Sequence, residues 1–282
     1  MTANPTPVSH YAEVLGTELH YTEWGAGQRE VVVAWHGLAR TGRDMDDIAA
    51  HLATRYRVIC PDTIGRGLSQ WSRDPANEYC FAHYERLALA LFDELGLDRV
   101  HWLGTSMGGA LGLRLAAGPL RGRIHRLVLN DIGPQLAAVA IDRIRSYAGN
   151  PPSFVTVSEL ENYFRAVYKP YGTLSDAQWR RLTETSTRRL PDGRVAPHYD
   201  PLMVMQFIHH PADYDQWEAW DRLDVPVLVL RGADSDLLEA AVADEMTRRG
   251  PRATLITVPD CGHAPALNTP EHFGWVADFL AD

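Results

Sequence analysis

A serine flanked by glycines is the residue whose surroundings most clearly suit covalent chemistry. Ser106 stands in GTSMG at 104–108, directly after an apolar run at 99–103 and before a small-residue helical segment at 107–117. On a sharp turn from strand to helix, glycine neighbours leave room for the strained backbone that exposes a serine hydroxyl. Free amides at the start of that helix favour a developing oxyanion nearby. The pattern therefore predicts that Ser106 is a nucleophile.

A serine hydroxyl needs a base before it can attack a carbonyl, and histidine is the usual one. Of the twelve histidines, His263 lies in DCGHAP at 260–265, a loop that precedes the final helical segment at 270–281. In an open α/β sheet, such a loop lies at the carboxyl edge of the strands, where ligands bind. We therefore predict that His263 is the base.

An aspartate must orient the imidazole and stabilise its charged form. Asp236 and Asp234 lie in the loop after the apolar run at 226–231, and Asp131 directly follows the run at 124–130. All three follow predicted strands and satisfy the chain order Ser, Asp, His. The sequence favours Asp236, with Asp131 as the alternative acid and Asp234 as a third choice.

Backbone amides in two loops could hold an oxyanion. Gly37 and Leu38 come just after the apolar run at 31–35. Because the glycine lets the backbone bend, the amide of Leu38 can face the same site as the amide of Met107. We predict an oxyanion hole made of these two amides, and we interpret the neighbouring His36 as a structural hydrogen-bonding residue.

Motifs for a cofactor or a metal are missing from the sequence. The glycine-rich segment at 62–69 lacks the Gly-Lys-Ser/Thr of a phosphate loop. Residues 104–109 lack the pattern of a dinucleotide site. His209 and His210 are adjacent, so they would point apart on a helix, and no carboxylate motif accompanies them. The sequence predicts chemistry on a small-molecule substrate without a cofactor or a metal.

Short apolar runs alternate with helical segments along most of the chain. Wholly apolar, valine-rich runs are typical of strands that are buried on both faces of a parallel sheet. The alternation predicts βαβ units with right-handed crossovers, and residues 9–24 predict a hairpin at the sheet's edge. The other predicted strands are 31–35, 57–60, 99–103, 124–130, 226–231 and 253–258, and the predicted helices are 44–54, 79–95, 107–117, 237–249 and 270–281.

One interval interrupts this alternation. Between residues 134 and 222 there is no convincing buried strand, only helical segments separated by Pro and Gly, with many aromatic residues. An insertion of about ninety residues is too long for a simple crossover. We predict a helical cap, or lid, at 134–222 over the carboxyl edge of the sheet. The core would then consist of residues 1–133 and 223–282.

These residues resemble the α/β-hydrolase fold family, in its serine-nucleophile branch with a helical cap. The resemblance covers essentially the whole chain. It implies an α/β fold with an eight-stranded, mostly parallel sheet, helices on both faces, and a cap inserted after the sixth strand. It also implies a triad of the serine, an acid and the histidine. The segments that carry it are HGL at 36–38, DTIGRGLS at 62–69, GTSMGG at 104–109, RGADSDLL at 231–238 and GHAP at 262–265.

The chain departs from the family's pattern at the acid. The usual acid stands three residues after the glycine that follows the seventh strand, where this chain has Ser235. Asp236 comes one residue later, and Asp131 follows the sixth strand, where some relatives place the acid. Dehalogenases and epoxide hydrolases of this fold use an aspartate as the nucleophile. The serine at 106 therefore leaves ester, lactone, thioester, amide and carbon–carbon hydrolysis.

Charge and composition limit the partners. The formal net charge is −9, the pI is near 5.7 and basic residues form no tract, so nucleic acid is not expected as a partner. The longest apolar runs are far too short to cross a bilayer, and the first residues show no signal peptide. Three widely separated cysteines suit a reducing compartment. We expect a cytoplasmic protein without membrane contact, and the sequence is compatible with a homo-oligomer.

The main hypothesis is a carboxylesterase-like serine hydrolase that cleaves a small ester or lactone through an acyl-enzyme on Ser106. The alternative is a carbon–carbon bond or amide hydrolase in an aromatic or heterocycle degradation pathway, because it would use the same triad. A non-catalytic ligand receptor on this scaffold is a further rival. Cap arginines could hold a substrate carboxylate, although a solvated helix face accounts for them more simply: Arg143, Arg145, Arg165, Arg180 and Arg181.

Overall fold

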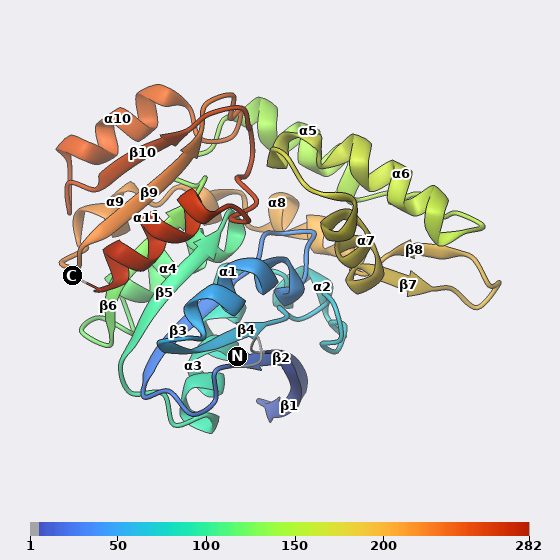
Figure 1. The fold of residues 1–282 in the computed structure, drawn as a ribbon, viewed down its shortest axis with the longest axis horizontal. Helices are drawn as coiled ribbons and strands as arrows, with labels where there is room; N and C mark the ends of the chain where they lie inside the picture. Colours follow the sequence, from blue (N-terminus) through green and yellow to red (C-terminus); the bar gives the residue numbers. More distant parts are fainter. Residues whose placement is uncertain (1–5, 282) are drawn as a thin grey trace.

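A twisted sheet of eight strands forms the centre of the molecule (Figure 1). The computed structural model describes residues 6–281. The strand order is β1-β2-β4-β3-β5-β6-β9-β10, in which β1 to β2 and β2 to β4 are antiparallel and the other pairings are parallel. This is the mostly parallel sheet that the alternation predicts, with the hairpin at its edge. The strands are β1 (Val8–Val14), β2 (Thr17–Trp24), β3 (Glu30–Trp35), β4 (Tyr56–Pro61), β5 (Val100–Thr105), β6 (Ile124–Asn130), β9 (Val227–Gly232) and β10 (Thr254–Val258).

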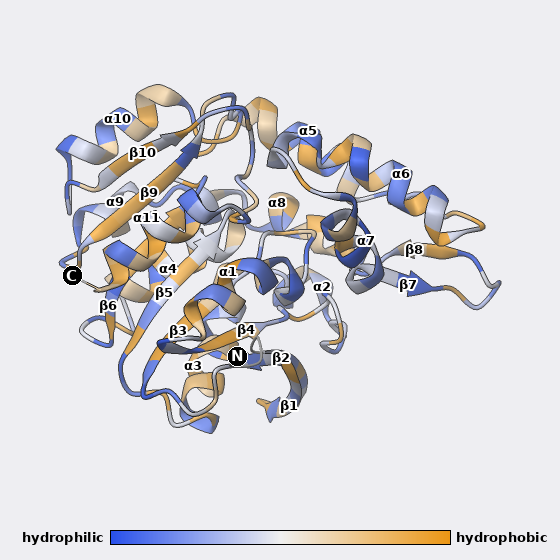
Figure 2. Ribbon diagram, in the orientation of Figure 1, coloured by the Kyte–Doolittle hydropathy of each residue, from blue (hydrophilic) through white to orange (hydrophobic). Residues whose placement is uncertain are grey.

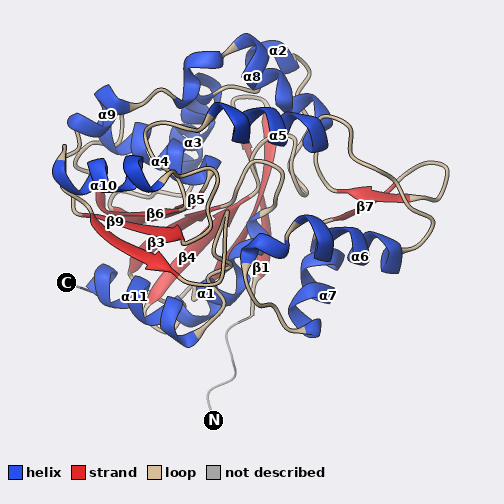
Figure 3. Ribbon diagram, turned by 90° about the horizontal axis from the view of Figure 1, so that it is seen from above, coloured by secondary structure: helices blue, strands red, loops and turns tan. Residues whose placement is uncertain are grey.

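Helices cover both faces of the sheet, which explains why the central strands are apolar throughout rather than alternating (Figures 2 and 3). The helices α3, α4, α9 and α10 pack on one face, and α1 and α11 pack on the other. Within residues 6–281, no helix has the length and apolar character needed to span a bilayer. The helices are α1 (Asp46–Leu52), α2 (Pro75–Glu78), α3 (Phe81–Glu94), α4 (Met107–Ala117), α9 (Trp217–Asp221), α10 (Ala240–Arg248) and α11 (Pro270–Ala281).

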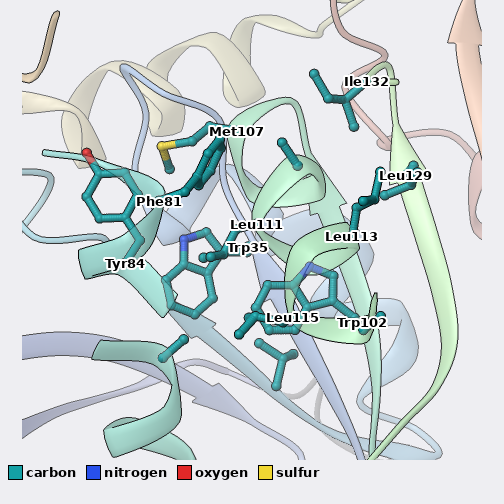
Figure 4. Packing of buried hydrophobic residues seen from close by; sticks show 14 of the residues in the cluster. Trp35, Phe81, Tyr84, Trp102, Met107, Leu111, Leu113, Leu115, Leu129 and Ile132 are labelled. Atoms are coloured by element: carbon teal, nitrogen blue, oxygen red, sulfur yellow. The ribbon is translucent and has the colours of Figure 1, made fainter. Parts of the chain in front are cut away.

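Two buried tryptophans fix the position of α4 on the sheet (Figure 4). The rings of Trp35 and Trp102 stack with centroids 5.3 Å apart. The indole nitrogen of Trp35 donates to Thr63 Oγ1 at 2.8 Å, and that of Trp102 donates to the Gly108 carbonyl at 2.9 Å. Both indole N–H groups are therefore satisfied inside the core, as buried aromatic donors need to be. The start of α4 is in this way attached to β5.

The segment between β6 and β9 extends away from the sheet (Figure 1). It contains a two-stranded ribbon that the sequence pattern does not predict, because strands of three residues are too short to show an alternation. The ribbon closes through Gly193, which has a φ of 85°. The last helix of the segment between β6 and β9 is α9. It packs against α4, where Trp220 is fully buried. The other elements are α5 (Ala138–Ala148), α6 (Val157–Val167), α7 (Asp176–Thr185), β7 (Thr187–Arg189), β8 (Val195–Pro197) and α8 (Gln206–His209).

The inserted helices have their own capping and their own small core. Side chains of Thr156 and Ser175 form capping boxes at the starts of α6 and α7, which satisfy amides that the helices leave free. An apolar cluster joins α6, α7 and β8. A salt bridge of 2.6 Å between Arg181 and Asp47 attaches α7 to α1. The cluster consists of Leu160, Phe164, Tyr168, Trp179, Leu182 and Val195.

His36 connects the ends of β3 and β4 through a fully buried ring. Its Nδ1 donates to the Gly37 carbonyl at 2.6 Å, and its Nε2 accepts from the Thr63 amide at 3.0 Å. Burial lowers the pKa of His36 to about 4. The ring is therefore neutral at neutral pH, as its acceptor role requires. The carbonyl of His36 also accepts from the Gly108 amide at 3.1 Å.

Alanine in place of Gly112 tests the close approach of α4 to β5. A β-carbon on Gly112 would lie 2.2 Å from Trp102 Nε1, whereas one on Gly274, inside α11, meets nothing within 4 Å. Both substitutions gain helix propensity, so they differ only in this clash. We expect Gly274→Ala to stabilise the protein by about 0.5–1 kcal/mol. Gly112→Ala should destabilise it by about 1–3 kcal/mol in urea unfolding, and equal effects would contradict the packing described.

His36 should make stability depend on pH. Its pKa in the folded protein, about 4, lies below the ordinary 6.5, so between these values the unfolded chain binds the proton more readily. The free energy of unfolding should therefore fall as the pH decreases from about 6.5 to about 4. In His36→Gln this fall should be smaller, by up to roughly 3 kcal/mol. Urea titrations across that range measure it, and parallel curves for the two proteins would refute the assignment.

Candidate active site

Ser106 occupies the turn between β5 and α4 in a strained conformation, with φ 51° and ψ −117°. At this turn the end of β5 lies very close to the start of α4, which in turn lies very close to the end of β3. A β-carbon on Gly104 would lie 2.3 Å from the Gly108 carbonyl oxygen, and one on Gly108 would lie 2.3 Å from the Trp35 carbonyl oxygen. The Ser106 amide donates to the Asn130 carbonyl at 2.9 Å. The surrounding backbone thus holds the strain that presents the hydroxyl.

Ser106, His263 and Asp131 form a hydrogen-bonded chain. Ser106 Oγ lies 2.9 Å from His263 Nε2, and His263 Nδ1 lies 2.7 Å from Asp131 Oδ2. With the proton of the neutral imidazole on Nδ1 and donated to the carboxylate, Nε2 is free to accept the serine proton. These are the distances that a hydroxyl nucleophile, its base and an orienting acid require.

The Asp131 carboxylate is fully buried and has three donors around it. Besides His263, the amide of Gly232 donates to Oδ1 at 2.8 Å, and the hydroxyl of Ser235 donates to Oδ2 at 2.6 Å. Ser235 therefore occupies the usual position of the family's acid but supports an acid that comes from the neighbouring strand. These contacts provide hydrogen-bond partners for both carboxylate oxygens and fix the direction of the carboxylate toward the imidazole.

The structure corrects the preference for Asp236 as the partner of His263. The Asp236 side chain is 54% exposed, and its carboxylate pairs with Arg143 of α5 at 2.8 Å. Asp234 is also exposed. Asp236 directly follows Ser235, and in this loop that single step along the chain turns the side chain away from the imidazole and toward the inserted helices. The serine at the usual acid position was the signal in the sequence that favours Asp131.

The loop after β3 passes close to Ser106, and Leu38 of this loop lines the same cavity as Ser106. A β-carbon on Gly37, the residue before Leu38, would lie 3.6 Å from Ser106 Cβ. Among the hydrogen bonds within residues 6–281, none is donated by the amides of Leu38 or Met107. The Leu38 carbonyl accepts from Arg66 Nε at 2.9 Å. Arg66 is fully buried and holds this loop, a role that the glycine-rich context of 62–69 does not reveal.

A cavity of about 540 Å³ opens above Ser106 and His263. Its walls come from the loop after β3, the loop after β9, and α5 and α6 of the inserted segment. Apolar and tyrosine side chains dominate the walls, as is usual in small-molecule sites. The lining includes Leu38, Ala39, Arg40, Arg143, Ile144, Ser146, Tyr147, Val167, Tyr168, Pro170, Tyr171, Asp234 and Asp236.

The charged groups of the inserted segment are largely paired with one another or with the core. Among the five cap arginines, Arg143 lines the cavity, and its pairing with Asp236 leaves little charge for a substrate. Within the described part of the chain, no group of three or more His, Cys, Asp or Glu side chains is arranged for a metal ion. His210, considered above with His209, contacts the Ala76 carbonyl at 2.9 Å. The other paired arginines are Arg145 with Asp142, Arg165 with Glu161 and Asp176, and Arg181 with Asp46 and Asp47.

Comparison with known proteins identifies relatives along the whole chain. A 3-hydroxybutyrate-oligomer hydrolase of Cupriavidus necator is 38% identical over 270 residues, which cover 92% of each chain. A 2-hydroxy-6-oxononadienedioate/2-hydroxy-6-oxononatrienedioate hydrolase of Paraburkholderia phymatum is 27% identical and covers 99% of this chain and 98% of its own. An α/β hydrolase structure from Novosphingobium aromaticivorans superposes with a TM-score of 0.86 at 33% identity, over 98% of each chain. The model of the alpha/beta hydrolase family matches residues 31–278, and the chain belongs to that family.

Proposed function

We propose that the protein is a serine hydrolase of small carboxylic esters and that oligomers of 3-hydroxybutyrate are its substrate class. The observation that carries the proposal is the hydrogen-bonded chain from Ser106 through His263 to Asp131 below a cavity of about 540 Å³. The relative from Cupriavidus necator, which is named for hydrolysis of such oligomers, supports the choice of substrate. Each ester bond in these oligomers joins two short hydroxy acids.

In the proposed reaction, His263 Nε2 takes the proton from Ser106 Oγ while the oxygen attacks the ester carbonyl. The negative charge that develops on the carbonyl oxygen is held by the amides of Leu38 and Met107, and each such donor contributes about 10²–10³ in turnover. His263 then gives the proton to the departing alcohol, which leaves an acyl-enzyme. Water, activated by the same imidazole, releases the acid. Asp131 accepts from His263 Nδ1 and orients the ring.

The cavity fits a substrate of this size and polarity. Its volume of about 540 Å³ lies in the ordinary range for small-molecule sites. Ile144 and Val167 provide apolar surface, and the rings of Tyr147 and Tyr168 provide both apolar surface and a hydroxyl. An ester of hydroxybutyrate offers the complementary pattern, because methyl and methylene groups alternate with carbonyl oxygens along it.

Replacement of Ser106 by alanine should abolish hydrolysis. Removal of a triad nucleophile costs about 10⁶-fold in turnover, because the covalent step is lost. Turnover of the wild-type protein and of Ser106→Ala is measured with two substrates, the dimer of 3-hydroxybutyrate and a short-chain nitrophenyl ester. A fluorophosphonate probe should label the folded wild-type protein and leave Ser106→Ala unlabelled.

Two results would contradict the proposal in different ways. Undiminished ester hydrolysis by Ser106→Ala would remove Ser106 from the mechanism. A folded wild-type protein that takes no label and cleaves no ester would favour a ligand receptor. A panel of diketones and amides extends the test to the rival chemistry. Cleavage of those compounds without ester cleavage would favour a carbon–carbon or amide hydrolase, for which the Paraburkholderia phymatum relative is a precedent.

The two aspartates can be distinguished by paired substitutions. Asp131→Asn should reduce turnover by about 10³–10⁴, because an amide no longer holds the imidazole in the required tautomer. Asp236→Asn should change it by less than about tenfold, since an exposed ion pair contributes about 1 kcal/mol or less. Steady-state kinetics with a nitrophenyl ester measures both variants. The reverse order of losses would restore Asp236 as the acid.

A further inference from the structure

Arg40 is a buried arginine in the wall of the cavity above Ser106. It lines the cavity together with Ser106 and His263, although only 3% of the residue is exposed. The point at which a β-carbon on Gly37 would stand lies 3.6 Å from Ser106 Cβ and 3.8 Å from Arg40 Cγ. The two side chains therefore begin on either side of one glycine. The proposed mechanism assigns no part to Arg40.

Three neighbours hold this guanidinium in one orientation. Its Nε and Nη2 donate to the two carboxylate oxygens of Asp44, each at 2.6 Å, and Nη2 also donates to Ser186 Oγ at 2.9 Å. The ring of Tyr168 stacks on it, with the guanidinium carbon 4.5 Å from the ring centroid. A bidentate, stacked arginine loses little further freedom when it binds another group. Arg40 is in this sense a preorganised donor.

One nitrogen of Arg40 is left for a ligand. Within residues 6–281, Nη1 makes no hydrogen bond. Nη1 is also not one of the unpaired side-chain atoms in this part of the chain that lack accessible surface. Nη1 therefore keeps some accessible surface. Because Arg40 lines the cavity, we take this surface to face the cavity. A charged donor that is already held in position gains free energy when a substrate acceptor meets it there.

The charges around Arg40 indicate which acceptor this is. Asp44 balances Arg40, and Asp236 balances Arg143, which is the other arginine of the cavity. Both arginines in the described walls are therefore paired with carboxylates. A neutral carbonyl oxygen suits such a site, because binding it requires no unpaired positive charge. Resting on the proposed ester hydrolysis, we infer that Arg40 Nη1 positions the substrate by donating to the carbonyl oxygen of the unit next to the scissile ester.

Three substrates with the same scissile bond test this inference. In sec-butyl 3-hydroxybutyrate the alcohol side has no second carbonyl. The methyl ester of the 3-hydroxybutyrate dimer adds a neutral one, and the free dimer acid adds a carboxylate. We expect wild-type kcat/KM to be at least about tenfold higher for the dimer methyl ester than for the sec-butyl ester, because only the dimer methyl ester offers the charged donor a second carbonyl oxygen.

Arg40→Lys is the decisive variant. A lysine ammonium can still pair with Asp44 but has no second arm to offer the substrate. It should lower activity on every substrate, and it should reduce the ratio between dimer methyl ester and sec-butyl ester by about tenfold or more. Arg40→Met provides a second variant with the same expected loss of the ratio. The matched control is Ser186→Ala, which removes another contact of the same guanidinium and should keep the ratio while lowering the melting temperature.

The results of these assays separate failure of the positioning role of Arg40 from failure of the proposed ester hydrolysis. An unchanged ratio in folded Arg40→Lys, or a wild-type protein without preference for the dimer methyl ester, would overturn the inference and leave ester hydrolysis standing. Equal loss of the ratio in Ser186→Ala would reduce Arg40 to a structural link. A preference for the free dimer acid that disappears in Arg40→Lys would support a positioning role for Arg40. The acceptor would then be the terminal carboxylate rather than a neutral carbonyl oxygen. A wild-type protein that cleaves none of the three would defeat the proposed function, and the inference with it.

Discussion

A carboxylate enclosed by protein is tolerated only where donors surround it, and Asp131 is such a group. Its three donors come from separate parts of the chain: the end of β9, the loop that follows it, and the loop after β10. The order β6-β9-β10 in the sheet brings these three places to one edge. The same contacts that satisfy the charge therefore determine where the His263 imidazole lies. Fold and candidate chemistry depend here on one electrostatic requirement.

The part of the site around Ser106 depends on close packing instead. Strand β5 and helix α4 meet so tightly that Gly104 and Gly108 have no room for a side chain. The tryptophans behind them are hydrogen-bonded and stacked, so the strained turn at Ser106 rests on a rigid layer. A strained φ at one residue costs of the order of 1–3 kcal/mol, and this layer is what holds it in place. Substitutions in the layer would thus reach the site through the backbone.

Local signals explain what could be read from the sequence. The central strands appear as apolar runs, because both of their faces are covered, and GTSMG marks the turn at 104–108 by its glycines. The ordering of the aspartates failed because two carboxylates follow neighbouring strands and satisfy the same chain order. Which one meets His263 is decided by side-chain directions within one loop, where Ser235 points inward and Asp236 outward. Such directions have no local pattern in the sequence.

The paired arginines bear on how a substrate is selected. The cap sequence suggested cations that could attract a carboxylate, yet Arg143 meets Asp236, and in the core Arg40 meets Asp44. A cavity without unbalanced positive charge gives no long-range attraction to anions. Discrimination then rests on shape and on donors fixed at particular points, where a substrate that lacks the matching oxygen leaves a buried donor unpaired. That penalty is larger than the roughly 1–3 kcal/mol by which an apolar pocket discriminates between substrates that differ by one methylene. A few held donors in apolar walls therefore suit recognition of the proposed substrate, an oligomer of similar, mostly neutral units.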